Sequence, residues 1–212
     1  MSMHRNGLIH SQRRLTRRLA AYAIAACVGA PTPMSAEQRV IDTEHSMITV
    51  HVFKSGLFRA FADNHVIQAP VTDGSLDDGA TPQVQLVVDA QRMRVLDPGL
   101  SPGDREQVQT RMLGPEVLDA RRFPQIRFQS MTVERLSTNS WLVRGELTLH
   151  GQTHVLTVKV ALEQGRYNGS TLFKQTDFGM RPISIAGGTV RVKDEVKIGF
   201  DIVAGPNPSA VR

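Results

Sequence analysis

The stretch WLVRGELTLHGQTHVLTVKVAL, residues 141–162, predicts two antiparallel strands joined by a tight turn. Leu147 and Leu149 flank Thr148, and from Leu156 to Leu162 every second side chain is a large apolar one. In an extended strand this period of two places the apolar side chains on one face. The short link His150-Gly151-Gln152 between the two runs therefore predicts a hairpin.

The same period of two recurs on both sides of this hairpin. The other alternating runs are Ile48-Val50-Val52, Val84-Leu86-Val88, Ile126-Phe128 and Val196-Ile198-Phe200-Ile202. Glycine, aspartate and asparagine turn signals separate the runs, and helical periodicity is scarce. One apolar and one polar face is typical of half-buried antiparallel strands, so we predict an all-β domain. The alternation alone is compatible with a barrel and with a sandwich.

One stretch, residues 96–123, interrupts the strand pattern. Asp104 is expected to cap a short helix that continues to Met112, and Gly114 is expected to end it. Residues 116–120 are expected to form a further helical turn. We therefore predict one helical insertion in an otherwise β domain.

The N-terminal residues have the pattern of a secretory signal. Five arginines precede an apolar run from Leu19 to Ala30, and no acidic residue occurs before Glu37. The run is shorter than the roughly 20 apolar residues that span a bilayer. We predict a signal peptide over residues 1–36, a single domain over 37–205 and a loose tail over 206–212. In an alternative interpretation, Ile24-Ala25-Ala26-Cys27 is a lipobox, and a lipidated Cys27 anchors the domain to a membrane.

The charge distribution excludes several classes of function. The five arginines before residue 37 account for the whole net charge of +5, so the remainder is neutral. The basic pI is therefore no argument for nucleic-acid binding. Cys27 is the one cysteine of the chain, so the remainder can form neither a disulfide nor a zinc–thiolate site.

Five segments, in order along the chain, resemble the YceI-like family of polyisoprenoid-binding, lipocalin-like periplasmic proteins. They are Ile41-Asp42-Thr43-Glu44-His45-Ser46-Met47-Ile48, the stretch 118–130 with Phe123-Pro124, the stretch 145–153, Thr176-Asp177-Phe178-Gly179-Met180, and Val192-Lys193-Asp194-Glu195-Val196. The resemblance implies an extended eight-stranded antiparallel barrel around a long apolar tunnel, which in the family holds an isoprenoid chain. Asp63-Asn64-His65 departs from the family's usual Ser-Gly ending, where the ligand's head group is expected.

The candidate ligand-binding residues follow from this resemblance. They are Phe53, Phe58, Phe61, Phe123 and Phe128 as tunnel lining, with His51 and His65 as polar contacts to a head group. Because both a tunnel and a filled barrel require inward apolar residues, the sequence leaves these two interpretations open.

The expected function is that of a periplasmic carrier for a long apolar ligand, such as an isoprenoid quinone or a polyprenyl lipid. No resident cofactor, no nucleic-acid partner and no catalytic residue are expected, since no known catalytic motif occurs. A metal- or cofactor-dependent enzyme that uses His45, His51 and His65 is one alternative. A solid barrel that acts in stress response or through its surface is the other. The sequence does not indicate an oligomeric state.

Overall fold

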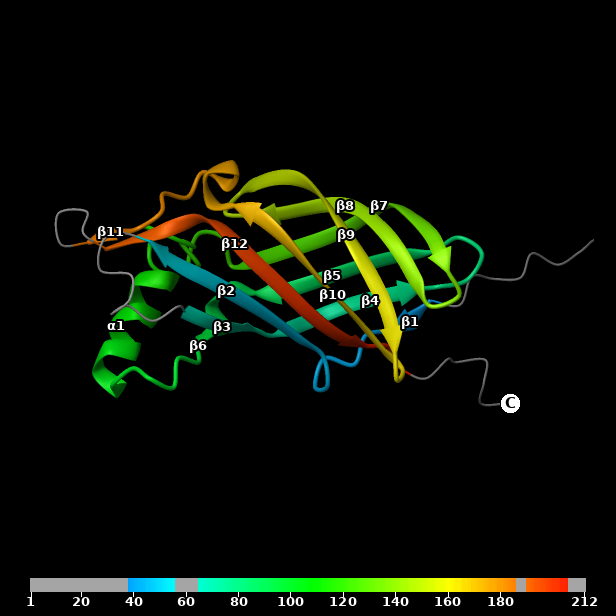
Figure 1. The fold of residues 1–212 in the computed structure, drawn as a ribbon, viewed down its shortest axis with the longest axis horizontal. Coiled ribbons are helices and arrows are strands. Elements are labelled where there is room, and N and C mark those ends of the chain that lie inside the picture. The colour runs from blue at the N-terminus through cyan, green and yellow to red at the C-terminus, as the bar shows by residue number, and fades with distance from the viewer. Residues whose placement is uncertain (1–37, 56–64, 186–189, 206–212) are drawn as a thin grey trace, which may run out of the picture. The chain divides into compact units, whose positions relative to one another are not determined.

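A computed structural model describes residues 38–55, 65–185 and 190–205 (Figure 1). Phe58 and Phe61 lie outside the described residues, as do the predicted signal and Cys27. The strands are β1 (Arg39–Val40), β2 (Met47–Ser55), β3 (His65–Ala69), β4 (Val71–Asp77), β5 (Gln83–Asp89), β6 (Arg94–Val95), β7 (Gln125–Ser137), β8 (Ser140–Leu149), β9 (Gln152–Glu163), β10 (Arg166–Lys174), β11 (Ser184–Ile185) and β12 (Val190–Val203). The helices are α1 (Pro102–Leu113) and the 3₁₀ turns η2 (Ala90–Arg92) and η3 (Gln175–Phe178).

All of these strands join one antiparallel sheet, as the alternation predicts. Its order is β1-β4-β5-β7-β8-β9-β10-β12-β2-β3-β6, with β11 paired to β12. The predicted hairpin is confirmed, since β8 and β9 pair from Leu149 opposite Gln152 to Ser140 opposite Ala161. His150 and Gly151 have φ values of 51° and 73°, and such a pair of positive φ values belongs to the two-residue turn that matches strand twist.

The expected number of eight strands is wrong, because the described residues already form a sheet of twelve. Pro70 separates β3 from β4, since proline cannot donate a ladder hydrogen bond. Three further strands, β1, β6 and β11, have only two residues each. The additional strands are therefore short or divided pieces of the antiparallel pattern rather than a second layer.

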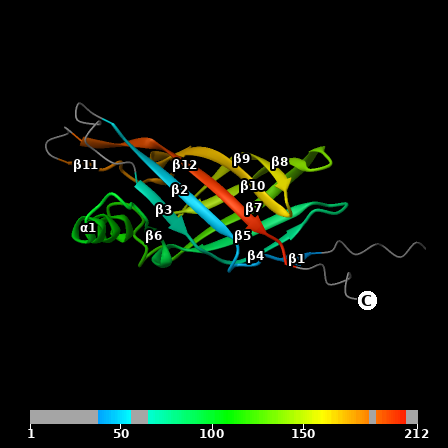
Figure 2. The same cartoon turned by 60° about the horizontal axis from the view of Figure 1, so that its bottom comes forward.

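The sheet curls into a half-barrel, and a short N-terminal segment ties it together at one end (Figures 1 and 2). The Ile41 amide donates to the carbonyl oxygen of Gly74 in β4 at 3.0 Å, and the Asp42 amide donates to that of Val203 in β12 at 2.9 Å. Ile41 also forms an isolated bridge with Ala204. The two sides of the curled sheet are thus joined through backbone hydrogen bonds.

The predicted helix exists and lies at the opposite end of the half-barrel from β1 (Figure 1). Its cap is Ser101 and not Asp104: the Ser101 hydroxyl oxygen accepts from the Asp104 amide and donates to the Asp104 carboxylate. The first backbone N–H groups of a helix have no partner within the helix, so proline, which has no N–H, is well suited to its first position. The helix therefore begins at Pro102, three residues before the start that a cap at Asp104 would give. Gly114 follows the last helical residue, as predicted. Residues 115–118 form a turn instead of the expected helical turn.

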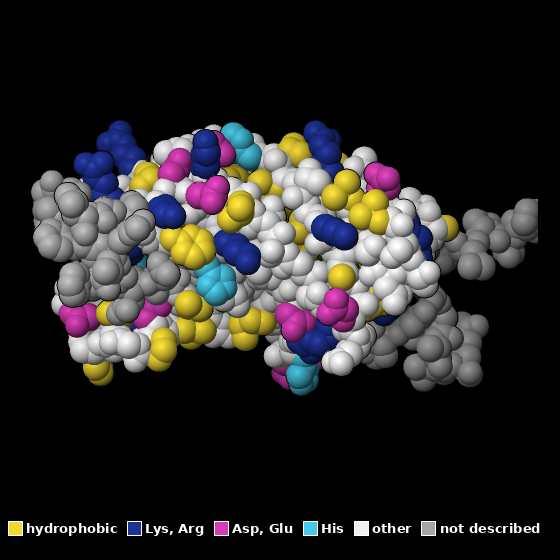
Figure 3. Space-filling view, viewed as in Figure 1, with side chains coloured by type: hydrophobic (Ala, Val, Ile, Leu, Met, Phe, Trp, Pro, Cys, Tyr) yellow, Lys and Arg dark blue, Asp and Glu magenta, His cyan; other side chains and the backbone are white. Residues whose placement is uncertain are grey.

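Buried apolar residues from the strands, α1 and the connecting segments form two groups. The group near α1 includes Met112, Leu118, Phe178 and Met180. The group at the other end includes Leu76, Trp141, Tyr167 and Ile202. On the face shown in Figure 3, charged side chains of both signs are interspersed with hydrophobic ones over the described surface. None of the described helices is long and apolar enough to cross a membrane.

Gly151→Ala should destabilise the protein more than Gly165→Ala does. Both glycines have positive φ, 73° and 78°, in two-residue turns between consecutive strands. An alanine in this backbone region costs about 1–2 kcal/mol at either site. A Cβ on Gly151 would also lie 2.6 Å from Cε1 of Phe123, whereas a Cβ on Gly165 meets nothing within 4 Å.

We therefore expect urea unfolding to give a further loss of at least about 1 kcal/mol for Gly151→Ala, from overpacking. Equal losses for the two variants would show that Phe123 does not pack tightly on this turn.

Candidate functional site

The curled sheet encloses an apolar cavity of about 220 Å³. The long strands, the turn after β4, α1 and the segment 115–124 all contribute to its lining. Ile48, Val50 and Val52 illustrate the construction: they occupy alternate positions of β2, all line the cavity, and all are only partly buried. The inward side chains thus leave space between them, and this enclosed space favours a hollow barrel over the solid-barrel alternative.

The polar residues of the lining gather mainly at the end away from α1. Asp77, Asp78, Gln83 and Tyr167 lie there, and we call this group the mouth. Gln83 is exposed to solvent, so the lining reaches the surface at the mouth. At the α1 end, by contrast, the lining residues Met93, Met112, Leu118 and Met180 are buried. The cavity therefore has one polar end and one apolar, covered end.

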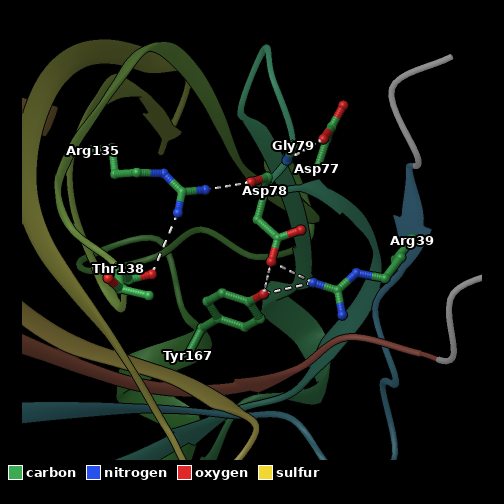
Figure 4. A network of polar contacts seen from close by, with 7 residues as sticks. All are labelled: Arg39, Asp77, Asp78, Gly79, Arg135, Thr138 and Tyr167. Atoms are coloured by element: carbon green, nitrogen blue, oxygen red, sulfur yellow. Dashed lines mark hydrogen bonds and ion pairs between the residues drawn. The ribbon is translucent and has the colours of Figure 1, made fainter. Parts of the chain in front are cut away.

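Asp78 is the centre of a hydrogen-bonded network at the mouth (Figure 4). Its Oδ2 accepts from Nη2 of Arg39 at 2.9 Å and from the Tyr167 hydroxyl at 2.5 Å. The same Arg39 nitrogen donates to the Tyr167 oxygen at 2.6 Å. Nη2 of Arg135 donates to the backbone carbonyl oxygen of Asp78 at 2.8 Å. One residue of the β4–β5 turn is thus bonded to side chains from β1, β7 and β10.

Two aromatic rings stand beneath this network. The rings of Trp141 and Tyr167 have centroids 5.8 Å apart. The Arg39 guanidinium lies 5.8 Å from the Tyr167 centroid, and that of Arg135 lies 5.3 Å from the Trp141 centroid. Each arginine therefore covers one aromatic ring of the cavity wall while it is bonded to Asp78, a favourable cation–π geometry.

The mouth keeps Tyr167 protonated. Burial, followed by the hydrogen bond to the Asp78 carboxylate, raises the pKa of Tyr167 from 10.0 to about 12, while the Arg39 charge opposes this shift. Both leading causes disfavour a phenolate in this position. Tyr167 is therefore a neutral hydrogen-bond donor to Asp78 at physiological pH.

The described candidate phenylalanines occupy different places. Phe128 lines the cavity, as the resemblance suggests. Phe53 does not line it, because it lies on the outer face of β2 with Thr49 and His51, whereas Val52 lies on the inner face. Phe123 is also absent from the lining: its ring packs against that of His150 at a centroid distance of 4.8 Å. The expected lining role is therefore wrong for Phe53 and Phe123, and ligand binding by Phe128 stays a prediction.

The histidines do not converge as the sequence analysis allowed. Although β2 and β3 pair, Val52 lies opposite His65 and His51 opposite Val66, which places the two histidines on opposite faces of the sheet. His45 is exposed, and its Nδ1 lies within hydrogen-bond distance, 2.8 Å, of Oδ2 of Asp42. The described residues contain no group of three His, Cys, Asp or Glu side chains that could hold a metal ion. The metal-site alternative thus has no support within this part of the chain.

His65 has a partner that the sequence did not reveal. Its Nδ1 lies 2.5 Å from Oδ2 of Asp97, whose side chain is only 3% exposed. The other carboxylate oxygen of Asp97 accepts from the Val66 amide at 2.7 Å. Neither residue lines the cavity, so this pair secures the start of β3 to the loop before α1.

The mouth residues also escaped the sequence analysis. Asp77-Asp78-Gly79 has the composition of a solvated turn, and Tyr167 stands in an ordinary alternating strand. Arg39 and Tyr167 are 128 residues apart in the sequence. The lone tryptophan of the chain was the one local signal that could have drawn attention to this place.

The fold and cavity define a hollow, antiparallel β protein with an apolar interior. The sequence model of the YceI-like domain matches residues 40–204, and the chain belongs to this family. No curated protein sequence matches the chain significantly.

Two solved structures are similar in fold. The first is BcnA of Burkholderia cenocepacia, with a TM-score of 0.57 and 20% identity over 78% of this chain and 99% of that one. The second is a polyisoprenoid binding domain from Saccharophagus degradans implicated in plant cell wall breakdown, with a TM-score of 0.53 and 16% identity over 79% of this chain and 97% of that one.

The free energy of unfolding should fall as the pH rises from 10.0 to about 12. In this window the unfolded chain loses the Tyr167 proton while the folded chain keeps it, because the folded pKa is the higher one. The contribution of Tyr167 to stability is complete below pH 10.0 and is lost progressively as the pH rises to about 12. Urea unfolding at several pH values measures this loss.

Tyr167→Phe is the control, since it removes the titrating group and keeps the ring. Its stability should depend less on pH across this window, and an unchanged dependence would contradict the assignment.

Asp78→Asn should lower the pKa of Tyr167, because it removes a carboxylate that favours the protonated phenol. The ionisation of Tyr167 is measured as the ultraviolet absorbance of the Asp78→Asn protein minus that of the Asp78→Asn protein that also carries Tyr167→Phe.

Proposed function

We propose that this protein binds one long apolar molecule, such as an isoprenoid quinone or a polyprenyl lipid, and carries or shields it in the periplasm without transforming it. The cavity supports this proposal: it is enclosed by the sheet, its lining is almost entirely apolar, and it extends from the mouth to α1. Ligand sites in proteins are typically apolar cavities with a few placed polar groups, which is the composition found in this barrel.

The physical advantage of such a site lies in the insolubility of a long hydrocarbon. Each methylene that leaves water for the cavity contributes about 0.8 kcal/mol. Alternate positions of β2, β5, β9 and β12 supply aliphatic side chains for this purpose without any reacting group. A carrier requires this lining and a polar group that holds the head, and the mouth offers both charged and neutral partners.

The similar proteins support the same proposal. The Saccharophagus degradans structure is described as a polyisoprenoid binding domain, and it shares the fold of this chain. The family match, residues 40–204, covers every strand residue of the described sheet except Arg39. We extend the ligand class to this chain because the lining of its own cavity is largely apolar from α1 to the mouth.

The proposed location follows from the N-terminal residues. The basic segment and the apolar run before residue 31 have the order of a secretory signal. Export would place the carrier in the periplasm, where a water-filled space separates two membranes.

N-terminal sequencing of the mature protein from its own host should give Glu37 as the first residue. A lipidated Cys27 at that position would instead establish a membrane-anchored form, and an intact N-terminus would contradict export by this signal.

Native mass spectrometry should detect the ligand directly. We expect protein purified from its own host to carry one long-chain apolar molecule, which organic extraction removes and added polyprenol restores. Protein that is empty on purification and takes up no polyprenol would contradict the proposed function.

Val50→Phe should reduce polyprenol binding at least about tenfold, while Thr49→Phe should not. Val50 lines the cavity, and Thr49 is the preceding residue of β2, on the outer face. In a filled core the larger ring costs about 1–3 kcal/mol of stability. In the hollow barrel it occupies ligand space, so the melting temperature of Val50→Phe should stay close to that of the unmodified protein. Equal binding by both variants would show that the cavity is not the site.

A further inference from the structure

One buried donor at the mouth end has no acceptor. Within the part of the chain that the structure describes, Nε1 of Trp141 is the one buried side-chain nitrogen or oxygen without a hydrogen-bond partner. The residue as a whole is 4% exposed. Buried polar groups in proteins are nearly always paired, and an indole N–H is a donor that cannot accept a bond instead. The position of Trp141 therefore requires an explanation.

Trp141 belongs to the wall of the cavity. It shares one face of β8 with Val143, Leu147 and Leu149, which are all buried and line the cavity. Its side chain is thus directed into the barrel, beside Tyr167 and below Arg135. The neighbouring polar groups are already engaged: Tyr167 donates to Asp78, and Arg135 donates to the backbone of the same residue. An unengaged donor in a cavity wall is a place where a ligand atom can bind.

We propose that the indole N–H of Trp141 donates a hydrogen bond to an uncharged acceptor oxygen of the ligand, such as a carbonyl oxygen. This inference rests on the proposed function and adds two properties of the ligand: the chemical type of its head group and the direction in which it lies in the cavity. The oxygen-bearing head lies at the mouth, and the apolar chain runs toward α1, where the lining residues Met93, Met112, Leu118 and Met180 are apolar and buried.

Charge argues for a neutral head. The lining at this end includes the two carboxylates of Asp77 and Asp78, and the Arg39 guanidinium is already paired with Asp78. The Arg135 guanidinium lies 5.3 Å from the Trp141 ring centroid, but its hydrogen bonds go to the backbone carbonyl oxygens of Asp78 and Thr138. A carboxylate or phosphate beside Trp141 would have to compete for that arginine inside an apolar cluster near two acidic groups, and burying an ion at such a site is disfavoured. A carbonyl oxygen needs only the donor that Trp141 supplies.

Gln83, at the mouth, also carries an amide donor, but it is exposed, so solvent can satisfy it. Two further uncharged polar lining residues are engaged by the backbone. The Thr171 hydroxyl donates to the carbonyl oxygen of Thr157, and the Gln175 amide nitrogen donates to that of Lys193. Both side chains are therefore held by the sheet itself. Trp141 remains the buried donor that a ligand can satisfy.

The single tryptophan makes the test direct. Because the chain contains one Trp, a nitrogen–proton correlation spectrum of the lipid-extracted full chain shows one indole N–H resonance. Three probes of equal chain length are added: a saturated methyl ketone, the alkane and the carboxylate. We expect the ketone to move the indole proton downfield and the alkane to leave it near its starting position. We also expect the ketone to bind roughly tenfold more tightly than the alkane, since it satisfies a buried donor.

Trp141→Phe removes the donor and keeps an aromatic ring below Arg135. In this variant the ratio of ketone affinity to alkane affinity should fall to about one, and a melting temperature close to that of the unmodified protein shows that the barrel is intact. Should the variant fail to fold, the indole shift of the unmodified chain still decides the question.

The remaining outcomes separate this inference from the proposed function. If ketone and alkane bind equally and the indole proton does not shift, the role of Trp141 is overturned while apolar binding stands. If the carboxylate binds as tightly as the ketone, the preference for an uncharged oxygen is overturned. If neither the ketone nor the alkane binds, the proposed function itself fails.

Discussion

The alternation of apolar and polar side chains along each strand determines how this protein folds. In an extended chain consecutive side chains point to opposite sides, so a run such as Ile48-Val50-Val52 must send its apolar groups to one face. A sheet with one apolar face has to cover that face, and this sheet does so by curling on itself. The backbone bonds of Ile41 and Asp42 to β4 and β12 hold the curl at one end, and α1 covers the other. The cavity remains because the inward side chains do not fill the enclosed space.

The mouth shows how polar groups are managed in such a barrel. Asp78 is bonded to Arg39 and Tyr167 through its side chain and to Arg135 through its backbone, so one turn is fixed to three distant strands. The guanidiniums also lie over the rings of Tyr167 and Trp141. Charge, hydrogen bonding and aromatic packing are thereby concentrated at the polar end, and the rest of the lining can stay apolar. The unsatisfied Trp141 N–H lies just inside this polar group, where a ligand head would pass from solvent into the cavity.

Some errors of the sequence analysis were avoidable and others were not. The alternation that placed Val52 inward also placed His51 and Phe53 outward, so their exclusion from the lining could have been read from the same pattern. The helix cap at Ser101 instead of Asp104 also has a local signal, since Pro102 favours the first helical position. The packing of Phe123 on His150 has no such signal, because it depends on how a loop meets the β8–β9 turn.

What the sequence determined by itself is local: the strands, the β8–β9 hairpin, the helical insertion and the apolar face of each strand. These features arise from periodicity and turn chemistry, which act over a few residues. The tertiary structure alone decided that the barrel is hollow, that Asp97 joins His65, and that Arg39, Asp78, Arg135 and Tyr167 meet at one end of the cavity. Such contacts depend on strand order and register across the whole sheet, and no short stretch of sequence contains that information.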